Sequence, residues 1–279
     1  MFGILLQIIG TFTEEVSEAL GKDNVRRRIE KIWTLGFLNA LMAFVGLLFI
    51  ITFFRGWDTM TLHAWPTFVI RALLLVVQSV MTIKAIVHSE RSTFGFLRVG
   101  TIPLILVIDL LLGVVLSGWQ ILGMLCIAGT ILLLSLNHGL SRKGIGYVLF
   151  GTVSAAIQLS LLSYNVKHGN TVELEQLGVM CVVIPAFYYL ARRAGEGSPL
   201  QALRQRRVLL QSSLHGGAMI LGSYAFLYAP ASVLLAAARG SAVMASVLTG
   251  HWFFHEKKFA LKIAGFIGCA IGIALLMSG

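Results

Sequence analysis

Residues 32–54 read IWTLGFLNALMAFVGLLFIITFF, a run of 23 residues without a charged side chain. A helix rises about 1.5 Å per residue, so a run of this length crosses the ~30 Å hydrocarbon core of a bilayer. The whole chain of 279 residues is 57% hydrophobic and only 12% charged, which is about half the charged fraction of a soluble domain. The sequence therefore predicts a helical protein that lies in a membrane.

Further apolar runs of similar length flank this stretch on both sides, and each is long enough for a transmembrane helix. We therefore expect an all-α integral membrane protein with about ten transmembrane helices and no soluble domain. Glutamates interrupt the first run, so whether that run spans the membrane is left open. The runs cover residues 1–21, 32–54, 66–87, 94–116, 118–136, 145–165, 174–191, 206–228, 231–254 and 260–278.

Lysine and arginine are concentrated in alternate connections between the apolar runs. Seventeen of them lie after the first, third, fifth, seventh and ninth runs, whereas the other connections hold only Arg55 and Lys167. Cytoplasmic loops are enriched in these residues, so we expect the odd-numbered connections in the cytoplasm and both termini outside. If the first run does not span, the N-terminus is cytoplasmic. A bacterial-type inner or plasma membrane is the expected location.

Other functional classes find little support. The net charge of +10 comes from short basic clusters between apolar runs, so we expect no nucleic-acid partner. Cys126, Cys181 and Cys269 lie within apolar runs without ligand spacing, and no metal or cofactor is expected. His251 and His255 lie one helical turn apart, a spacing that suits either a metal or, as we favour, a cytoplasmic gate or interfacial anchor. No catalytic set is visible, so the protein is not expected to be an enzyme.

The two halves of the chain resemble each other. Residues 123–134 and 265–276 are identical at five of twelve positions at an offset of 142, and Arg98 corresponds to Arg239 at an offset of 141. Five helices per repeat is an odd number, so the second repeat would enter the bilayer upside down, as in many secondary transporters. The expected repeats are residues 1–137 and 144–279.

The run YAPAS at residues 228–232, followed by Arg239, Gly250 and Glu256, resembles the drug/metabolite transporter superfamily, specifically its EamA-type ten-helix permeases. The resemblance is strongest over residues 224–278. It implies a secondary active transporter that moves a small metabolite or amphipathic organic compound by alternating access. It also implies that helices three, four, eight and nine line the cavity. Members usually have both termini in the cytoplasm, whereas the charge distribution of this chain places them outside.

Two alternatives stay open beside this hypothesis. One is an uncoupled exchanger of anionic phosphorylated or nucleotide-linked sugars, in which arginines would bind the anion. The other is a membrane protein that does not transport, in which Arg98 and Arg239 would pair with Asp109 and with glutamates of the first run.

Ionisable side chains at bilayer depth are costly and usually face the protein interior. Guanidinium groups there could hold an anionic or zwitterionic substrate through forked hydrogen bonds. Lone polar side chains on other apolar helices serve either as further ligands or as interhelical hydrogen bonds. The candidate substrate-binding residues are Arg71, Arg98, Arg239, Gln78, His215 and Tyr224.

The first run carries Glu14, Glu15 and Glu18, of which Glu14 and Glu18 share a helical face. The stretch from Glu15 to Lys22 resembles the first helix of small multidrug resistance proteins. That resemblance implies proton coupling through Glu15, with Glu18 beside it. The alternative is an interfacial helix end with solvated glutamates.

Proline and glycine mark points of bending and close packing. Pro103 and Pro185 lie inside apolar runs, and each removes a backbone hydrogen bond and permits a kink. Gly268 and Gly272 form a small-xxx-small pair, which predicts close helix packing within the chain or across a homodimer.

Overall fold

The structure is a computed structural model that describes residues 2–57, 65–104, 107, 117–137, 139–225, 228 and 231–278. Its secondary structure in these ranges is entirely helical, so the all-α prediction is confirmed for them. The elements are α1 (Phe2–Arg26), α2 (Ile32–Ile50), the π-helix η1 (Ile51–Arg55), α3 (Trp65–His88), α4 (Arg91–Val99), α6 (Gly118–Leu136), α7 (Ile145–Lys167), α8 (Val172–Arg193), the 3-10 helix η3 (Pro199–Arg204), α9 (Arg206–Ala225), α10 (Ala231–Phe254) and α11 (Phe259–Met277).

Several of these helices have the length and apolar character of membrane spans. Within the described ranges, five qualify, and α11 adds a shorter apolar stretch, Phe259–Leu275. Their large apolar side chains are widely exposed at the surface of the bundle, which is compatible with a multi-pass membrane protein. The five are Ile32–Phe54, Trp65–His88, Gly118–Leu136, Ile145–Leu162 and Val172–Arg193.

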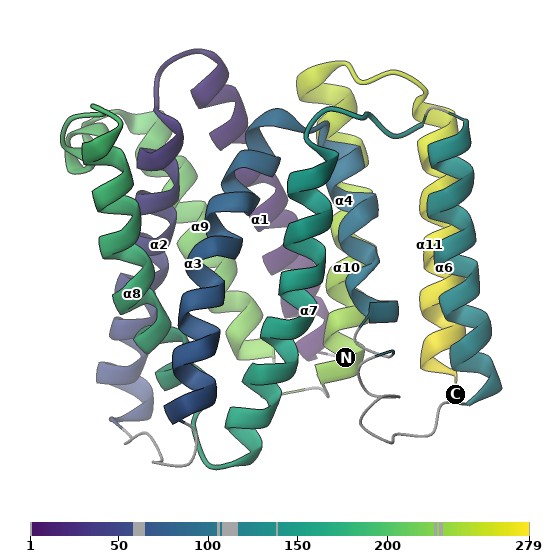
Figure 1. The fold of residues 1–279 in the computed structure, drawn as a ribbon, viewed down its shortest axis with the longest axis horizontal. Helices are drawn as coiled ribbons and strands as arrows, with labels where there is room; N and C mark the ends of the chain where they lie inside the picture. The colour runs from purple at the N-terminus through teal and green to yellow at the C-terminus, as the bar shows by residue number, and fades with distance from the viewer. Residues whose placement is uncertain are drawn as a thin grey trace.

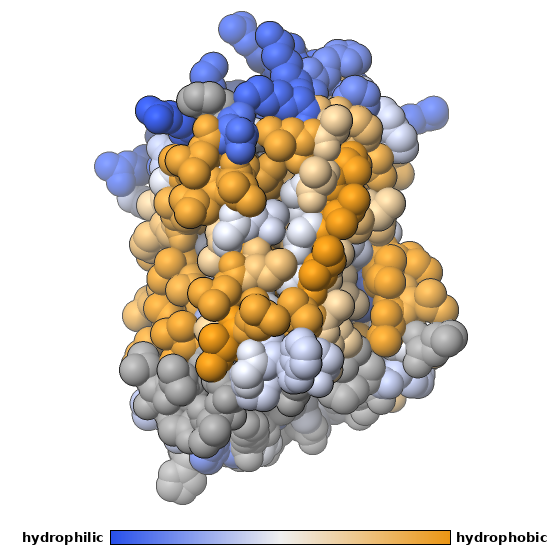
Figure 2. All heavy atoms as spheres, turned by 90° about the vertical axis from the view of Figure 1, so that its right-hand side faces the viewer, coloured by the Kyte–Doolittle hydropathy of each residue, from blue (hydrophilic) through white to orange (hydrophobic). Residues whose placement is uncertain are grey.

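The connections after α1, α3, α6, α8 and α10 all lie at one end of the bundle, the top in Figure 1. Figure 2 shows this end as a cap of hydrophilic side chains above a band of apolar ones. We call it the basic end, because these connections carry the clusters of lysine and arginine that the sequence places there. Helices α2 and α9 begin at the basic end, whereas α3 and α8 begin at the opposite end.

α1 lies among other helices, and its middle and C-terminal half are mostly buried. This helix packs against α9 and α10, and α2 packs against α8 and α9. On the other side of the bundle, α3 packs against α7 and α8, and α4 packs against α7 and α10. The pair of α6 and α11 stands side by side at the right of Figure 1.

Glycines allow two helix pairs to approach closely. A Cβ atom on Gly95 of α4 would lie 1.9 Å from Oγ of Ser246 on α10. A Cβ atom on Gly272 of α11 would lie 3.0 Å from the carbonyl oxygen of Gly123 on α6. Gly268 likewise faces α6, so the small-xxx-small surface of α11 packs within the chain.

Within the apolar run at residues 94–116, the structure describes residues 94–104 and 107, and α4 covers the first part of them. α4 ends at Val99, a turn follows at Gly100, and helix resumes over residues 101–104. Pro103 contributes to the break, because it lacks the N–H that would bond to the carbonyl oxygen of Val99. Asp109 lies outside the described residues. Pro185 lies inside α8, which continues through it as one helix.

Candidate functional site

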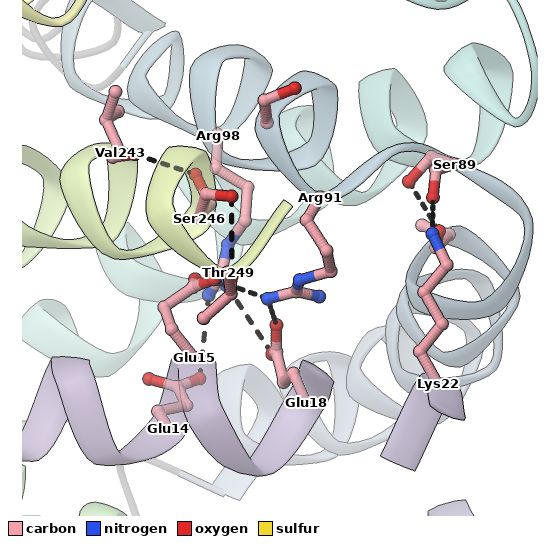
Figure 3. Close-up of polar contacts among 12 residues, drawn as sticks. Glu14, Glu15, Glu18, Lys22, Ser89, Arg91, Arg98, Val243, Ser246 and Thr249 are labelled. Carbon is pink, nitrogen blue, oxygen red and sulfur yellow. Dashed lines mark hydrogen bonds and ion pairs between the residues drawn. The ribbon is translucent and has the colours of Figure 1, made fainter. Parts of the chain in front are cut away.

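A cluster of carboxylates and guanidiniums joins α1 to α4. On α1, residues three and four apart fall on one side of the helix, so its glutamates face the same neighbour. On α4, Arg91 and Arg98 are seven residues apart, which is close to two full turns and places both on one face. Figure 3 shows both arginines pointing from α4 toward α1. The ion cluster consists of Glu14, Glu15, Glu18, Arg91 and Arg98.

Arg91 is the tightly bound arginine of the ion cluster. Its side chain is fully buried, and its Nη2 donates hydrogen bonds to the carboxylate of Glu15 and, at 2.7 Å, to that of Glu18. Its guanidinium also lies over the ring of Phe94, 5.1 Å from the centroid. A buried charge is tolerated only when it is paired in this way.

Arg98 is held more loosely. Its guanidinium nitrogens lie 3.6 Å from Glu18, 3.7 Å from Glu15 and 3.8 Å from Glu14. These distances are those of ion pairs that are too long for direct hydrogen bonds. Arg98 is also more exposed than Arg91, at 22% of its side chain against 0%. It therefore keeps donors free for another partner.

Arg239 lies on α10 near the ion cluster. It is buried, its Nε has no hydrogen-bond partner in the described part of the chain, and the charges of Arg98 and the α1 glutamates act on it. A buried guanidinium with an unsatisfied donor is destabilising. The Nε of Arg239 is thus a donor that a ligand or a second conformation could satisfy.

A cavity of about 190 Å³ lies beside the ion cluster. Glu14, Glu18 and Arg98 line it, together with amide, imidazole and hydroxyl groups from other helices. Its wall extends to Ile86 in the last turn of α3 and Tyr147 in the first turn of α7, both at the basic end. Further lining residues include Asn39, Gln78, Thr82, Thr101, His215, Phe94, Met180, Phe187 and Met219.

The structure brings some of the sequence-predicted residues together and not others. Arg98, Gln78 and His215 line the cavity, although they come from three different helices. Glu18 lines it as well, and Glu15 lies directly behind it in the ion cluster. The remaining three candidates, Arg71, Arg239 and Tyr224, are outside the lining of this cavity.

Arg71 instead belongs to a polar cluster at the end opposite the basic end. Its Nη1 lies 2.6 Å from Oε2 of Glu175 on α8, and its Nη2 donates to Gln176 at 3.2 Å. The side-chain amide of Gln158 on α7 donates to the carbonyl oxygen of Arg71 at 3.0 Å. We call Arg71, Gln158 and Glu175 the Arg71 cluster, and it ties α3 to both α7 and α8.

A second polar cluster joins three other helices nearer the basic end. The hydroxyl of Ser17 on α1 donates to the carbonyl oxygen of Gln211 on α9 at 2.8 Å. The side-chain amide of Gln211 donates to Asn39 on α2 at 2.9 Å and to the hydroxyl of Ser17 at 3.0 Å. We call Ser17, Asn39 and Gln211 the Gln211 cluster, and all three residues are buried.

Aromatic side chains lie over the basic end of the cavity. The ammonium group of Lys84 lies 5.7 Å from the ring of Trp33 on α2 and 5.7 Å from that of Tyr147 on α7. Trp33 also contacts Phe187 of α8, at 6.5 Å between ring centroids. Cation–π contacts of this kind are individually weak, so each holds α3 to α2 or α7 at this end with little energy.

Glu256 stabilises the start of α4. Its carboxylate accepts hydrogen bonds from the backbone N–H of Arg91 at 2.6 Å and of Ser92 at 3.3 Å, and it pairs with Lys262 at 3.0 Å. Burial opposes its ionisation, but hydrogen bonding from Ser92 and the charge of Lys262 hold the pKa of Glu256 below its ordinary value. A carboxylate at a helix N-terminus also interacts favourably with the helix dipole.

The nearby histidines do not form a pair on one helix face. His251 stacks on Phe259 at 4.4 Å between ring centroids, and His255 lies beyond the end of α10 with a φ of 52°. Within the described ranges, no group of three or more His, Cys, Asp or Glu residues is placed to hold a metal ion.

Arg91 and Glu175 are the site residues that sequence reasoning missed. Arg91 begins α4, so the sequence pattern groups it with the basic connection after the third apolar run, yet its spacing of seven residues to Arg98 is a usable signal. Glu175 lies in the first turn of α8, a position where acidic residues are common for helix-dipole reasons alone.

The sequence matches no protein-family model and no curated protein.

Proposed function

We propose that the protein is a secondary active transporter of the EamA-like kind that moves a small metabolite or amphipathic compound by alternating access, coupled to protons. The observation that carries the proposal is the cavity itself. Charged and polar side chains line it inside a bundle whose outer surface is largely apolar. Polar groups at such depth are costly, and in membrane proteins they typically mark a substrate or ion pathway.

The packing of the helices supports two inverted five-helix repeats. If α1, α2, α3, α4 and α6 correspond to α7, α8, α9, α10 and α11, the main helix contacts occur in equivalent pairs. α1 packs on α9 as α7 packs on α3, and α2 packs on α9 as α8 packs on α3. The pairs α2 with α8, α4 with α10, and α6 with α11 then each unite a helix with its own counterpart.

The two polar clusters support the same relationship. Gln158 donates to the backbone of Arg71 as Ser17 donates to the backbone of Gln211. The donors are 141 residues apart and the acceptors 140, close to the offset between the matching sequence stretches. The third members of the two clusters, Glu175 on α8 and Asn39 on α2, are 136 residues apart.

These clusters suit the two gates that alternating access requires. The Arg71 cluster closes the end opposite the basic end with a buried ion pair. The Gln211 cluster uses neutral hydrogen bonds nearer the basic end, toward which the cavity wall extends. Since lysine and arginine favour the cytoplasmic side, this conformation corresponds to a cavity that faces the cytoplasm.

The ion cluster suits proton coupling through Glu15 and Glu18. Both carboxylates are buried and bind Arg91, and both lie within ion-pair distance of Arg98. Protonation of one carboxylate would weaken its hold on these guanidiniums and free Arg98 for substrate. The cavity is small compared with typical ligand pockets of ~300–1,000 Å³, which argues against nucleotide-linked sugars as substrates.

Transport by proteoliposomes with a trapped pH-sensitive dye tests the proposal. Compounds that stabilise the detergent-purified protein in a thermal-shift screen are added with and without a pH gradient. We expect at least one to move protons through the wild type, and Glu15→Gln to abolish this proton movement. The matched control is Glu90→Gln, a carboxylate outside this cavity with 43% of its side chain exposed. Equal substrate movement with and without the gradient would refute proton coupling, and no counterflow of any compound would refute transport.

A further inference from the structure

The cavity presents charges of both signs at one place. Glu14 and Arg98 both line it, with 36% and 22% of their side chains exposed. Their nearest charged atoms are 3.8 Å apart, which is beyond hydrogen-bond distance. Both groups therefore keep hydrogen-bonding capacity that faces the cavity.

The other charges of the ion cluster are already engaged. Arg91 binds Glu15 and Glu18, and all three side chains are almost completely buried. With Arg239 nearby, the three carboxylates of α1 face three guanidiniums. The ion cluster and Arg239 therefore hold equal numbers of carboxylates and guanidiniums, and a ligand with a net charge would add an uncompensated charge where the surroundings solvate charge poorly.

A ligand with a single charge fits this arrangement badly. An anion placed against Arg98 would lie within a few ångströms of Glu14 and Glu18, whose carboxylates would repel it. A cation placed against Glu14 would meet Arg98 in the same way. A ligand with an ammonium and a carboxylate a short distance apart would satisfy both groups at once.

The rest of the cavity limits the size and character of the ligand. Its volume of about 190 Å³ is below the ~300–1,000 Å³ of typical ligand pockets. Phe94, Met180, Phe187 and Met219 supply an apolar and adaptable wall. We infer that the cavity binds a small zwitterion with a short apolar body, its ammonium at Glu14 and its carboxylate at Arg98. This inference rests on the proposed function, in which the cavity is the transport site.

Calorimetric titration of the full chain in detergent tests the inference with matched probes. Leucine is compared with isoamylamine, which lacks the carboxylate, and with isocaproate, which lacks the ammonium. Phenylalanine, phenethylamine and hydrocinnamate form a second set with an aromatic body. We expect each amino acid to bind at least about tenfold more tightly than either analogue, because each analogue leaves one charged group of the cavity without its hydrogen bond.

Substitutions separate the two ends of the ligand. Glu14→Gln is expected to remove the preference for the amino acid over its carboxylic acid, and Arg98→Gln the preference over its amine. Arg98→Lys keeps the positive charge and should retain the wild-type order of affinities for the amino acid and its analogues. This variant also keeps the inference testable if Arg98→Gln does not fold. Arg142→Gln, at an exposed position of the basic end, is the matched control and should change nothing.

The outcomes distinguish this inference from the proposed function. If an amine or an acid binds as tightly as its amino acid, the ligand carries one charge and the zwitterion inference is wrong, while transport stands. If none of the six compounds binds, the zwitterion inference is also wrong. Transport is then judged separately by the proton movement that the wider compound screen produces.

Discussion

Arg71 and Glu175 form a 2.6 Å ion pair between α3 and α8 with no more than 3% of either side chain exposed. Removing one partner of such a pair leaves an uncompensated buried charge, so Glu175→Ala should lower the free energy of unfolding by about 3–5 kcal/mol. Replacing both with leucine should restore most of that loss. Thermal unfolding in detergent measures both effects, and a double variant as unstable as the single one would contradict this prediction.

The two polar clusters predict opposite changes in access to the cavity. In a cysteine-free background with Gln78→Cys in the cavity wall, Arg71→Gln should increase labelling from the end that holds Lys167. Gln211→Leu should instead increase labelling from the basic end, because it removes the hydrogen bonds to Ser17 and Asn39. Each variant serves as the control of the other. If both raise labelling from the same end, the clusters are not opposing gates.

Removing the buried charges of the ion cluster distinguishes a transporter from a membrane protein that does not transport. The combined replacement of Arg91, Glu15 and Glu18 by methionine and leucines should leave thermal stability within a few kcal/mol of the wild type, as buried ion networks often permit. Transport in proteoliposomes should be lost, since the proposed proton carriers Glu15 and Glu18 are then absent and Arg98 keeps only Glu14 as an ion-pair partner. A triple variant that still transports would show that these charges serve only the fold.

The pH dependence of stability should include a contribution from Glu30, in the connection between α1 and α2. Burial raises the pKa of Glu30 to about 8, with the charge of Glu196 adding to the effect. Because the folded protein holds this proton more tightly than the unfolded chain, the contribution is fully present below pH 4.5 and is lost as the pH rises toward 8.

Glu30→Gln removes the titrating group and should flatten this decline between pH 5 and 8. The stability of the wild type and of Glu30→Gln, measured by unfolding in detergent across that pH range, tests this prediction, and Asp23→Asn is the control for removal of another carboxylate. A decline of equal size in Glu30→Gln would assign the pH dependence to other groups.

The distribution of lysine and arginine predicts an orientation in the membrane. With the basic end in the cytoplasm, a cysteine at Lys143 should react with an impermeant reagent only after the membrane is opened. A cysteine at Lys167 should react in intact cells. Labelling at Lys143 from outside would reverse the orientation.

Most helix boundaries could be predicted from the sequence because lipid imposes both a length and an apolar composition on each span. The run at 231–254 coincides with α10, and the run at 145–165 differs from α7 by two residues. The run at 94–116 was less predictable. There, Gly100 and Pro103 interrupt a helix whose hydropathy continues.

Part of the candidate site could also be predicted, from polar side chains that stand alone on apolar helices. Arg98, Gln78 and His215 stood out as single polar groups on apolar helices, and all three line one cavity. The pairing of Arg71 with Glu175 could not be predicted, because 104 residues separate them and no local pattern links α3 to α8. Hydropathy indicates which residues are costly to bury, whereas only the packing of helices decides which partner compensates them.

Gly95 and Ser246 mark where α4 and α10 meet without room for a methyl group. Neither helix can move nearer the other, and a gap there would sacrifice the dense contact between their backbones. If the two halves move as alternating access requires, a turn about this contact would preserve its packing. The same crossing that presents Arg98 to the cavity would thus serve as the fulcrum, so that a large swing at the membrane surfaces requires little displacement at the charged centre.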